Sequence, residues 1–317
     1  MNHDGFPDRM TVMARLMAGL GVLGAVVSVL LRIWMPASNL LTVCVMLAVL
    51  LALGGLAFLM HGGSRREITG KPSLGLSVAM LLVGAALVLH GVAEVLARLQ
   101  VIEFYSVTAN PLTEEANAMA VVLPWLQTAF SVVGGVALVL AGMRIASEGG
   151  TRRGVAQIGM LAPVLWTWLV LANYMMTYAS MVRVTQGVFT LGMYVMEMLF
   201  LFRFACYLAG VGKDSMGSLL FVSAGAVTFV LSAPLVRLVL YLLQDGEAYA
   251  ASGAAGPLDL AVGVLALVVS ITLCQSESAP VAEGTSDEDA PEWTGPSESA
   301  STADLIEEAD AEDLIEE

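Results

Sequence analysis

A single carboxylate, Glu197, stands in the middle of an apolar run that extends over residues 187–209. A helix formed by this run is long enough to cross a bilayer, and it places Glu197 roughly 15 Å below the surface, near the midplane. A carboxylate at that depth must be paired or protonated, and it marks a candidate functional site. Arg203 lies six residues further on and falls on a different face, so we do not expect the two to pair within the helix.

Other polar side chains fall at similar depths in neighbouring apolar runs. His90 and Glu94 are spaced i,i+4 and share one helix face, which Arg98 extends by one turn. We predict that three spans join the span of Glu197 around a polar pocket that opens to the outside and takes a small solute or a proton. The residues of this predicted pocket are Glu197, His90, Glu94, Arg237, Asn173 and Tyr174.

These polar residues also have a purely structural interpretation. Glu94 and Arg98 can form an ion pair at the membrane surface, and the long side chain of Arg237 can reach toward the headgroups. His90 can be a neutral, hydrogen-bonded packing residue. The sequence leaves both interpretations open. Glu197, however, lies too deep in its span for its side chain to extend to the headgroups.

The residue types for other chemistry are missing or badly spaced. A His-x-x-x-Glu pair could ligate a metal, but zinc needs three or four ligands, and His3 and His61 are predicted on the opposite side. No nucleotide-binding or hydrolase motif occurs. Cys44, Cys206 and Cys274 lie in or at the ends of apolar runs without a C-x-x-C spacing. We therefore expect no enzyme, no metal and no cofactor.

The elements that position these residues are eight long apolar runs. The chain is 57% hydrophobic and only 13% charged, too apolar to cover a soluble globule. The pattern predicts an all-α fold, a polytopic transmembrane helical bundle over residues 1–274. The expected spans are 12–35, 39–60, 73–97, 119–143, 155–179, 187–209, 216–243 and 257–274.

Small residues and prolines recur within these spans. Gly134 and Gly135 lie in the fourth span, and pairs such as Gly21 and Ala25 occur in others, so close approach of helix backbones is expected. Pro163 and Pro234 fall inside the fifth and seventh spans, where each removes a helix hydrogen bond and is expected to bend its helix.

Basic residues predict the orientation of the spans. With the N-terminus in the cytoplasm, nine Lys and Arg residues flank the spans on the cytoplasmic side and three on the opposite side, which follows the positive-inside rule. The nine are Arg9, Arg15, Arg65, Arg66, Lys71, Arg144, Arg152, Arg153 and Lys213, and the three are Arg32, Arg98 and Arg183. Eight spans return the C-terminus to the cytoplasm.

The last residues, 275–317, form a different kind of segment. They hold 15 of the 28 acidic residues and no basic one, so the remaining 13 acidic residues nearly balance the 14 Lys and Arg of the membrane part. Their composition predicts a disordered acidic tail. The sequence Asp-Leu-Ile-Glu-Glu occurs twice, around Leu305 and Ile306 and around Leu314 and Ile315. Two copies of a short motif could bind a cytoplasmic protein with avidity, or the tail could simply be a solubilising segment.

One stretch resembles a known group of proteins. Leu161-Ala162-Pro163-Val164-Leu165-Trp166, followed by a span with Glu197, Phe200, Phe202 and Tyr207, is similar to uncharacterised polytopic membrane proteins of anaerobic Gram-positive bacteria. The resemblance covers about residues 150–243. It implies a bacterial plasma membrane and carries no known activity.

Two functions remain open from these residues. The first is a membrane anchor or scaffold whose tail recruits a cytoplasmic partner. The alternative is a small-solute or proton-coupled transporter that uses the polar residues of the third, fifth, sixth and seventh spans. The partners implied are the lipid bilayer and, for the first function, a protein that binds the tail. Nucleic acid is not expected because the chain has no large basic patch.

Overall fold

The computed structural model describes residues 9–34, 39–61, 74–99, 118–148, 159–178, 184–209, 216–243 and 255–275. Within them the structure is helical, without a β-strand, which confirms the predicted all-α bundle. The helices are α1 (Arg9–Trp34), α2 (Asn39–His61), α3 (Leu74–Arg98), α4 (Ala118–Glu148), α6 (Leu161–Tyr178), α7 (Val184–Ala209), α8 (Met216–Ala226), the π-helix η1 (Val227–Leu231), α9 (Ser232–Leu242) and α11 (Pro257–Gln275). These bounds agree closely with the expected spans, except that α4 continues to Glu148 and α6 begins at Leu161.

Seven helical segments are long and apolar enough to cross a membrane, with α8, η1 and α9 counted together as one. The fifth expected span, 155–179, corresponds to α6, whose apolar part, Leu161–Met175, is shorter. At 1.5 Å per residue its 18 residues extend about 27 Å, slightly less than the hydrocarbon thickness. The chain is therefore a multi-pass membrane protein, as its composition indicates.

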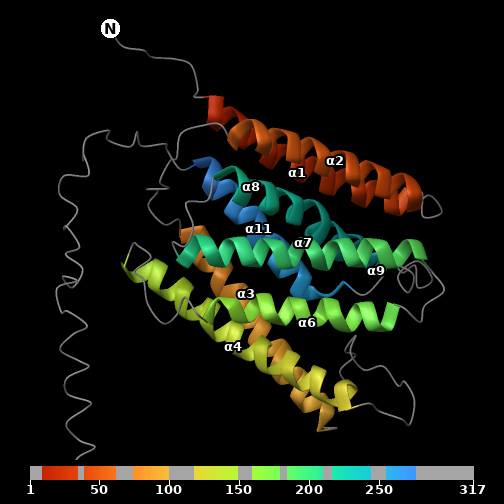
Figure 1. The fold of residues 1–317 in the computed structure, drawn as a ribbon, viewed down its shortest axis with the longest axis vertical. Coiled ribbons are helices and arrows are strands. Elements are labelled where there is room, and N and C mark those ends of the chain that lie inside the picture. The colour runs from red at the N-terminus through yellow and green to blue at the C-terminus, as the bar shows by residue number, and fades with distance from the viewer. Residues whose placement is uncertain are drawn as a thin grey trace, which may run out of the picture. The chain divides into compact units, whose positions relative to one another are not determined.

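The helices form two outer groups around a central one (Figure 1). α1 packs against α2 on one side, and α3, α4 and α6 pack in sequence on the other. Between them lie α7, the α8–η1–α9 helix and α11, which contacts α3, α8 and η1. The segment Gly217–Leu242 is the most enclosed, with 83% of its most apolar window buried, against 22% for α2.

α3 and α4 run antiparallel along a seam of small residues. Ser77 faces Gly142, Gly84 faces Gly135 and Gly91 faces Thr128, with a spacing of seven residues along each helix. A Cβ atom on Gly84 would lie 2.7 Å from the carbonyl oxygen of Gly135, and one on Gly135 would lie 2.6 Å from that of Gly84. Only glycine fits here, so the backbones approach as closely as small-residue motifs in membranes allow.

Gly134, next to Gly135 on α4, contacts a different helix, α6. A Cβ atom on Gly134 would lie 2.8 Å from the nitrogen of Pro163, so α6 begins directly against α4. Pro163 is the third residue of α6, where its missing N–H belongs to the unbonded first turn. Near the predicted bend of the fifth span the structure therefore has a helix start, which follows the helical residue Gly159 and a turn at Met160.

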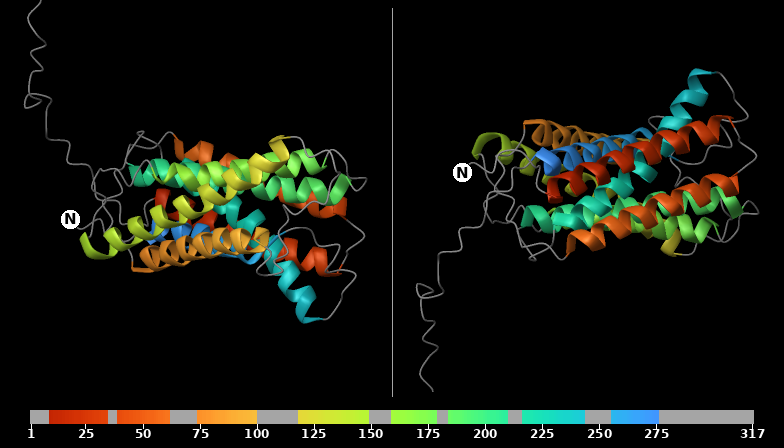
Figure 2. Two further views of the ribbon diagram at one scale, coloured as in Figure 1. Left: turned by 90° about the horizontal axis from the view of Figure 1, so that it is seen from below. Right: turned by 90° about the horizontal axis from the view of Figure 1, so that it is seen from above.

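The second predicted proline bend falls where the central helix changes geometry. Pro234 follows the five π-helical residues of η1, and α9 departs from the direction of α8 beyond this point (Figure 2). Proline removes one backbone donor and crowds the preceding turn, and a π-turn is a common way to accommodate such a disturbance. A close neighbour is α11, because a Cβ atom on Gly263 would lie 2.9 Å from the Cα atom of Leu231.

The acidic tail falls outside the described residues apart from Gln275. The two Asp-Leu-Ile-Glu-Glu motifs, with Leu305, Ile306, Leu314 and Ile315, therefore stay sequence-based predictions.

Candidate functional site

Glu197 lies in the protein interior and not against lipid. It is in the middle of α7, its side chain is fully buried, and neither carboxylate oxygen has a hydrogen-bond partner among the described residues. The absence of a pair with Arg203 agrees with the sequence-based expectation. A fully buried carboxyl group without a donor is unusual in a folded protein, because desolvation of its charged form has no compensation.

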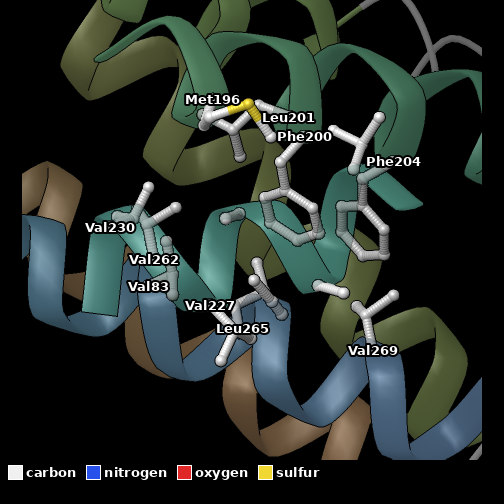
Figure 3. Close-up of a cluster of buried hydrophobic side chains, with 14 of the residues drawn as sticks. Val83, Met196, Phe200, Leu201, Phe204, Val227, Val230, Val262, Leu265 and Val269 are labelled. Carbon is white, nitrogen blue, oxygen red and sulfur yellow. The ribbon is translucent and has the colours of Figure 1, made fainter. Parts of the chain in front are cut away.

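Part of the core that follows Glu197 on α7 is apolar. Phe200 and Phe204 follow Glu197 on α7 and stack with ring centres 5.7 Å apart. Figure 3 shows their rings directed toward Val227 of η1 and toward Leu265 and Val269 of α11. Glu197 therefore adjoins a closely packed hydrophobic core.

A second carboxyl group, Asp259, approaches Glu197 from α11. The charges of the two groups are close enough to interact with each other through the protein. Asp259 is nearly buried, and its Oδ2 accepts a hydrogen bond of 2.6 Å from the backbone N–H of Gly256. Pro257 occupies the first helical position, so Gly256, Pro257 and Asp259 together form a regular helix start.

Asp259 was missed in the sequence-based prediction. An acidic residue soon after a Gly-Pro pair is a common signature of a helix N-terminus. Because this capping role already accounts for Asp259, the sequence gives no separate indication of a functional role. The signal that could have identified Asp259 is its place within an apolar run, where a carboxylate is as unusual as it is at Glu197.

Two tyrosines connect this carboxyl pair with α6. Tyr194 lies one turn before Glu197 on α7 and is buried, and its ring meets that of Tyr174 at 5.7 Å in an edge-to-face arrangement. The Tyr194 hydroxyl group is within electrostatic reach of Glu197, Asp259 and Tyr174. The predicted residue Tyr174 is thus adjacent to the carboxyl pair through Tyr194, which the prediction did not include.

Arg237 of α9 supplies positive charge on the same side. Its Nη1 donates a 2.8 Å hydrogen bond to the carbonyl oxygen of Ala255, directly before α11. Asp259 also interacts favourably with the charge of Arg237. Arg237 therefore fixes the start of α11 and balances one of the two carboxyl groups, and it is not simply extended toward headgroups.

Glu94 belongs to a separate, fully paired cluster at the α3–α4 seam. Its Oε2 lies 3.1 Å from Arg98 Nη2 and 2.7 Å from the Thr128 hydroxyl, and its Oε1 lies 3.4 Å from His90 Nε2. Arg98 also donates to the carbonyl oxygen of Pro124 at 2.9 Å. Glu94 and Arg98 thus form the ion pair of the structural interpretation, although Glu94 is only 2% exposed.

His90 lies between the two groups. Its ring and that of buried Trp166 from α6 meet edge to face with centres 6.2 Å apart. Asn173 lies half-buried on α6, one residue before Tyr174. The structure thus brings the carboxyl pair, Tyr174 and Arg237 together, with His90 as the neighbour toward Glu94. The helix that joins them is α11, which the prediction left out.

This arrangement defines a class: a multi-pass helical membrane protein with two interacting carboxyl groups in its interior, one of them without a hydrogen-bond donor among the described residues. Such a pair can hold a proton or a small cation. No family model matches the chain, and neither a curated protein nor a solved structure matches it.

Proposed function

We propose that this membrane protein moves a small solute across the bilayer in exchange or in step with protons, and that Glu197 carries the proton. The observation that supports this most directly is the fully buried carboxyl group of Glu197 without a hydrogen-bond donor. Carboxyl groups of this kind in membrane helices mark proton relays and ion pathways. The proposal assigns no covalent reaction to the chain.

The buried arrangement explains how the proton would be held and released. The proposal assigns the protonated form of Glu197 to the enclosed state, because a charged carboxylate that is fully buried there would have no compensating donor among the described residues. A state that admits water or solute next to α7 and α11 would let the proton leave. The Tyr194 ring contacts that of Tyr174 on α6. A movement of the side chains around Glu197 and Asp259 would therefore affect Tyr174 through Tyr194.

A transport assay tests this proposal. The purified full chain is placed in liposomes that enclose a pH-sensitive dye, and small amino acids, sugars, organic acids and amines are added outside one at a time. We expect at least one to drive proton movement with the native protein and none with Glu197→Gln, since an amide cannot release a proton. Glu148→Gln, at the end of α4, serves as the control and is expected to behave like the native protein.

Equal proton movement with Glu197→Gln contradicts the proposal, and so does a native protein that moves no protons with any solute of the panel. Asp259→Asn gives a second comparison. It keeps an oxygen that can accept the Gly256 N–H bond but removes the charge that interacts with Glu197, and we expect a shifted pH dependence of transport.

The second candidate function is a membrane scaffold. The repeated Asp-Leu-Ile-Glu-Glu sequence favours it, because two copies of one motif on an acidic tail could capture a cytoplasmic protein with avidity. In this proposal the protein lies in a bacterial plasma membrane with both termini in the cytoplasm, as the distribution of basic residues predicts.

The tail proposal has its own test. Full-length protein in detergent is compared with a variant in which Leu305, Ile306, Leu314 and Ile315 are all alanine, by affinity capture from a cell extract of the source organism. We expect a specific protein that is captured by the native chain and lost with the variant. Capture that is unchanged in the variant contradicts the scaffold. Proton movement is expected to be the same in both chains, so the two functions are distinguishable.

A further inference from the structure

One cavity lies between α2, α7 and η1, and neither Glu197 nor Asp259 is part of its wall. Its volume is about 200 Å³. Every residue that lines it is apolar, among them Val43, Leu47 and Leu50 of α2, Gly192 and Met196 of α7, and Phe229 of η1. None of the six predicted site residues contributes, so this space is not the predicted polar pocket.

Two features of the sequence create this space. Gly192 has no side chain where α7 faces η1, and a Cβ atom there would lie 3.2 Å from the Phe229 ring. Leu47 lies on the α2 wall and is 53% exposed, so the cavity borders the lipid-facing surface of the bundle. An apolar hollow at this surface is open to hydrocarbon chains of the bilayer.

A cation lies against one end of the cavity. Arg32, in the last turn of α1, places its guanidinium carbon 4.6 Å from the ring centre of Phe189, a residue of the cavity wall. Trp34 follows two residues later and is 79% exposed, which is typical of a side chain at the membrane interface. Arg32 therefore lies near the end of α1 beside one end of the cavity, with its Nη1 buried, whereas Leu50 and Met196 lie further along their own helices.

We propose that this cavity binds one acyl chain of an anionic phospholipid whose phosphate is held by Arg32. The wall is apolar along its length, and the volume is smaller than the clefts that enclose drug-sized ligands, so it fits part of a chain. A guanidinium group pairs well with phosphate oxygens. The lipid phosphate would then lie at the Arg32 end of the cavity, and the acyl chain would occupy the cavity itself. This site is independent of the transport proposal.

Native mass spectrometry of the full chain in detergent tests the site. Equal amounts of phosphatidylglycerol and phosphatidylcholine with the same acyl chains are added, and the retained lipid is measured. We expect the native protein to retain one phosphatidylglycerol about fivefold more than phosphatidylcholine, as one basic residue at an anionic membrane surface would give.

Two variants separate headgroup from chain. Arg32→Gln is expected to retain both lipids alike, because only the charge contact is removed. Leu47→Trp fills the cavity and is expected to retain neither lipid. The controls are Arg15→Gln, an exposed arginine at the other end of α1, and Leu51→Trp, an exposed α2 residue outside the cavity wall, and both should behave like the native protein.

A native protein without preference between the lipids overturns the proposal. Undiminished preference in Arg32→Gln, or undiminished phosphatidylglycerol in Leu47→Trp, does so as well. Gel filtration confirms that each variant is folded. If Leu47→Trp is not monodisperse, Leu50→Phe fills the deeper part of the same cavity and replaces it with the same expected loss.

Discussion

Glu197→Met is expected to make this protein more stable than its native form. Methionine has a similar length, and it removes a carboxyl group whose oxygens have no donor among the described residues. Removing a buried, unsatisfied polar group contributes about 1–3 kcal/mol to the free energy of unfolding. Many of the neighbouring side chains, such as Phe200 and Phe204, are apolar and would pack against methionine. Thermal unfolding in detergent, followed by the loss of monodisperse protein in gel filtration, measures the difference.

The matched control is Glu94→Met, the same change at a carboxyl group that is fully paired. It leaves Arg98 and Thr128 without their partner at the α3–α4 seam, so we expect a loss of about 1–3 kcal/mol. Opposite signs at the two positions would show that Glu197 is kept for a function at the expense of stability. A destabilised Glu197→Met would mean that Glu197 has a structural partner, and the transport proposal would lose its support.

Gly135→Ala is expected to destabilise the bundle strongly although it adds only one methyl group. In an ordinary helix this change is stabilising by up to about 1 kcal/mol. At the seam the new Cβ atom would lie 2.6 Å from the carbonyl oxygen of Gly84, so α3 and α4 must separate along their length. Overpacking of this kind costs about 1–3 kcal/mol, and here backbone rather than a side-chain end has to move. Thermal unfolding in detergent again measures the loss.

Gly55→Ala is the control for this prediction. Gly55 lies in α2, and a Cβ atom there meets nothing within 4 Å, so we expect no change or a small gain in stability. Gly84→Ala should reproduce the loss at Gly135, because each glycine faces the carbonyl oxygen of the other. If Gly135→Ala and Gly55→Ala behave alike, the close seam between α3 and α4 is contradicted.

Much of the fold was predictable because each element depends on its own residues. Apolar runs of about 20 residues define membrane helices without reference to their neighbours, and most helix ends agree with the predicted spans. The start of α6 was less predictable. The residues before Leu161 do not differ in hydropathy from a helix interior, and the position of Pro163 is explained only by its contact with Gly134.

The candidate site was predictable only where one residue is conspicuous by itself. The depth of Glu197 in its run indicated an interior carboxyl group, and the structure places it inside the bundle. The pairing of Glu94 depends on Thr128 and Pro124, which lie on another helix and have no distinctive sequence signal. Asp259 was missed because a helix start already accounts for it. Tyr194 was missed because an aromatic residue in an apolar run usually serves packing.

The π-helix η1 shifts the register of the central helix between α8 and α9. A π-turn contains one residue more than an α-turn. The Arg237 side chain therefore points in a direction that is rotated by roughly 100° about the helix axis, compared with its direction in an unbroken α-helix. If this π-turn became an α-turn, α9 with Arg237 would rotate about the helix axis relative to α8 with Ser223, and both would stay helical. Ser223 is hydrogen-bonded to Ser270 of α11, and Arg237 to Ala255 just before α11. The two halves of the central helix are thus attached to opposite ends of α11.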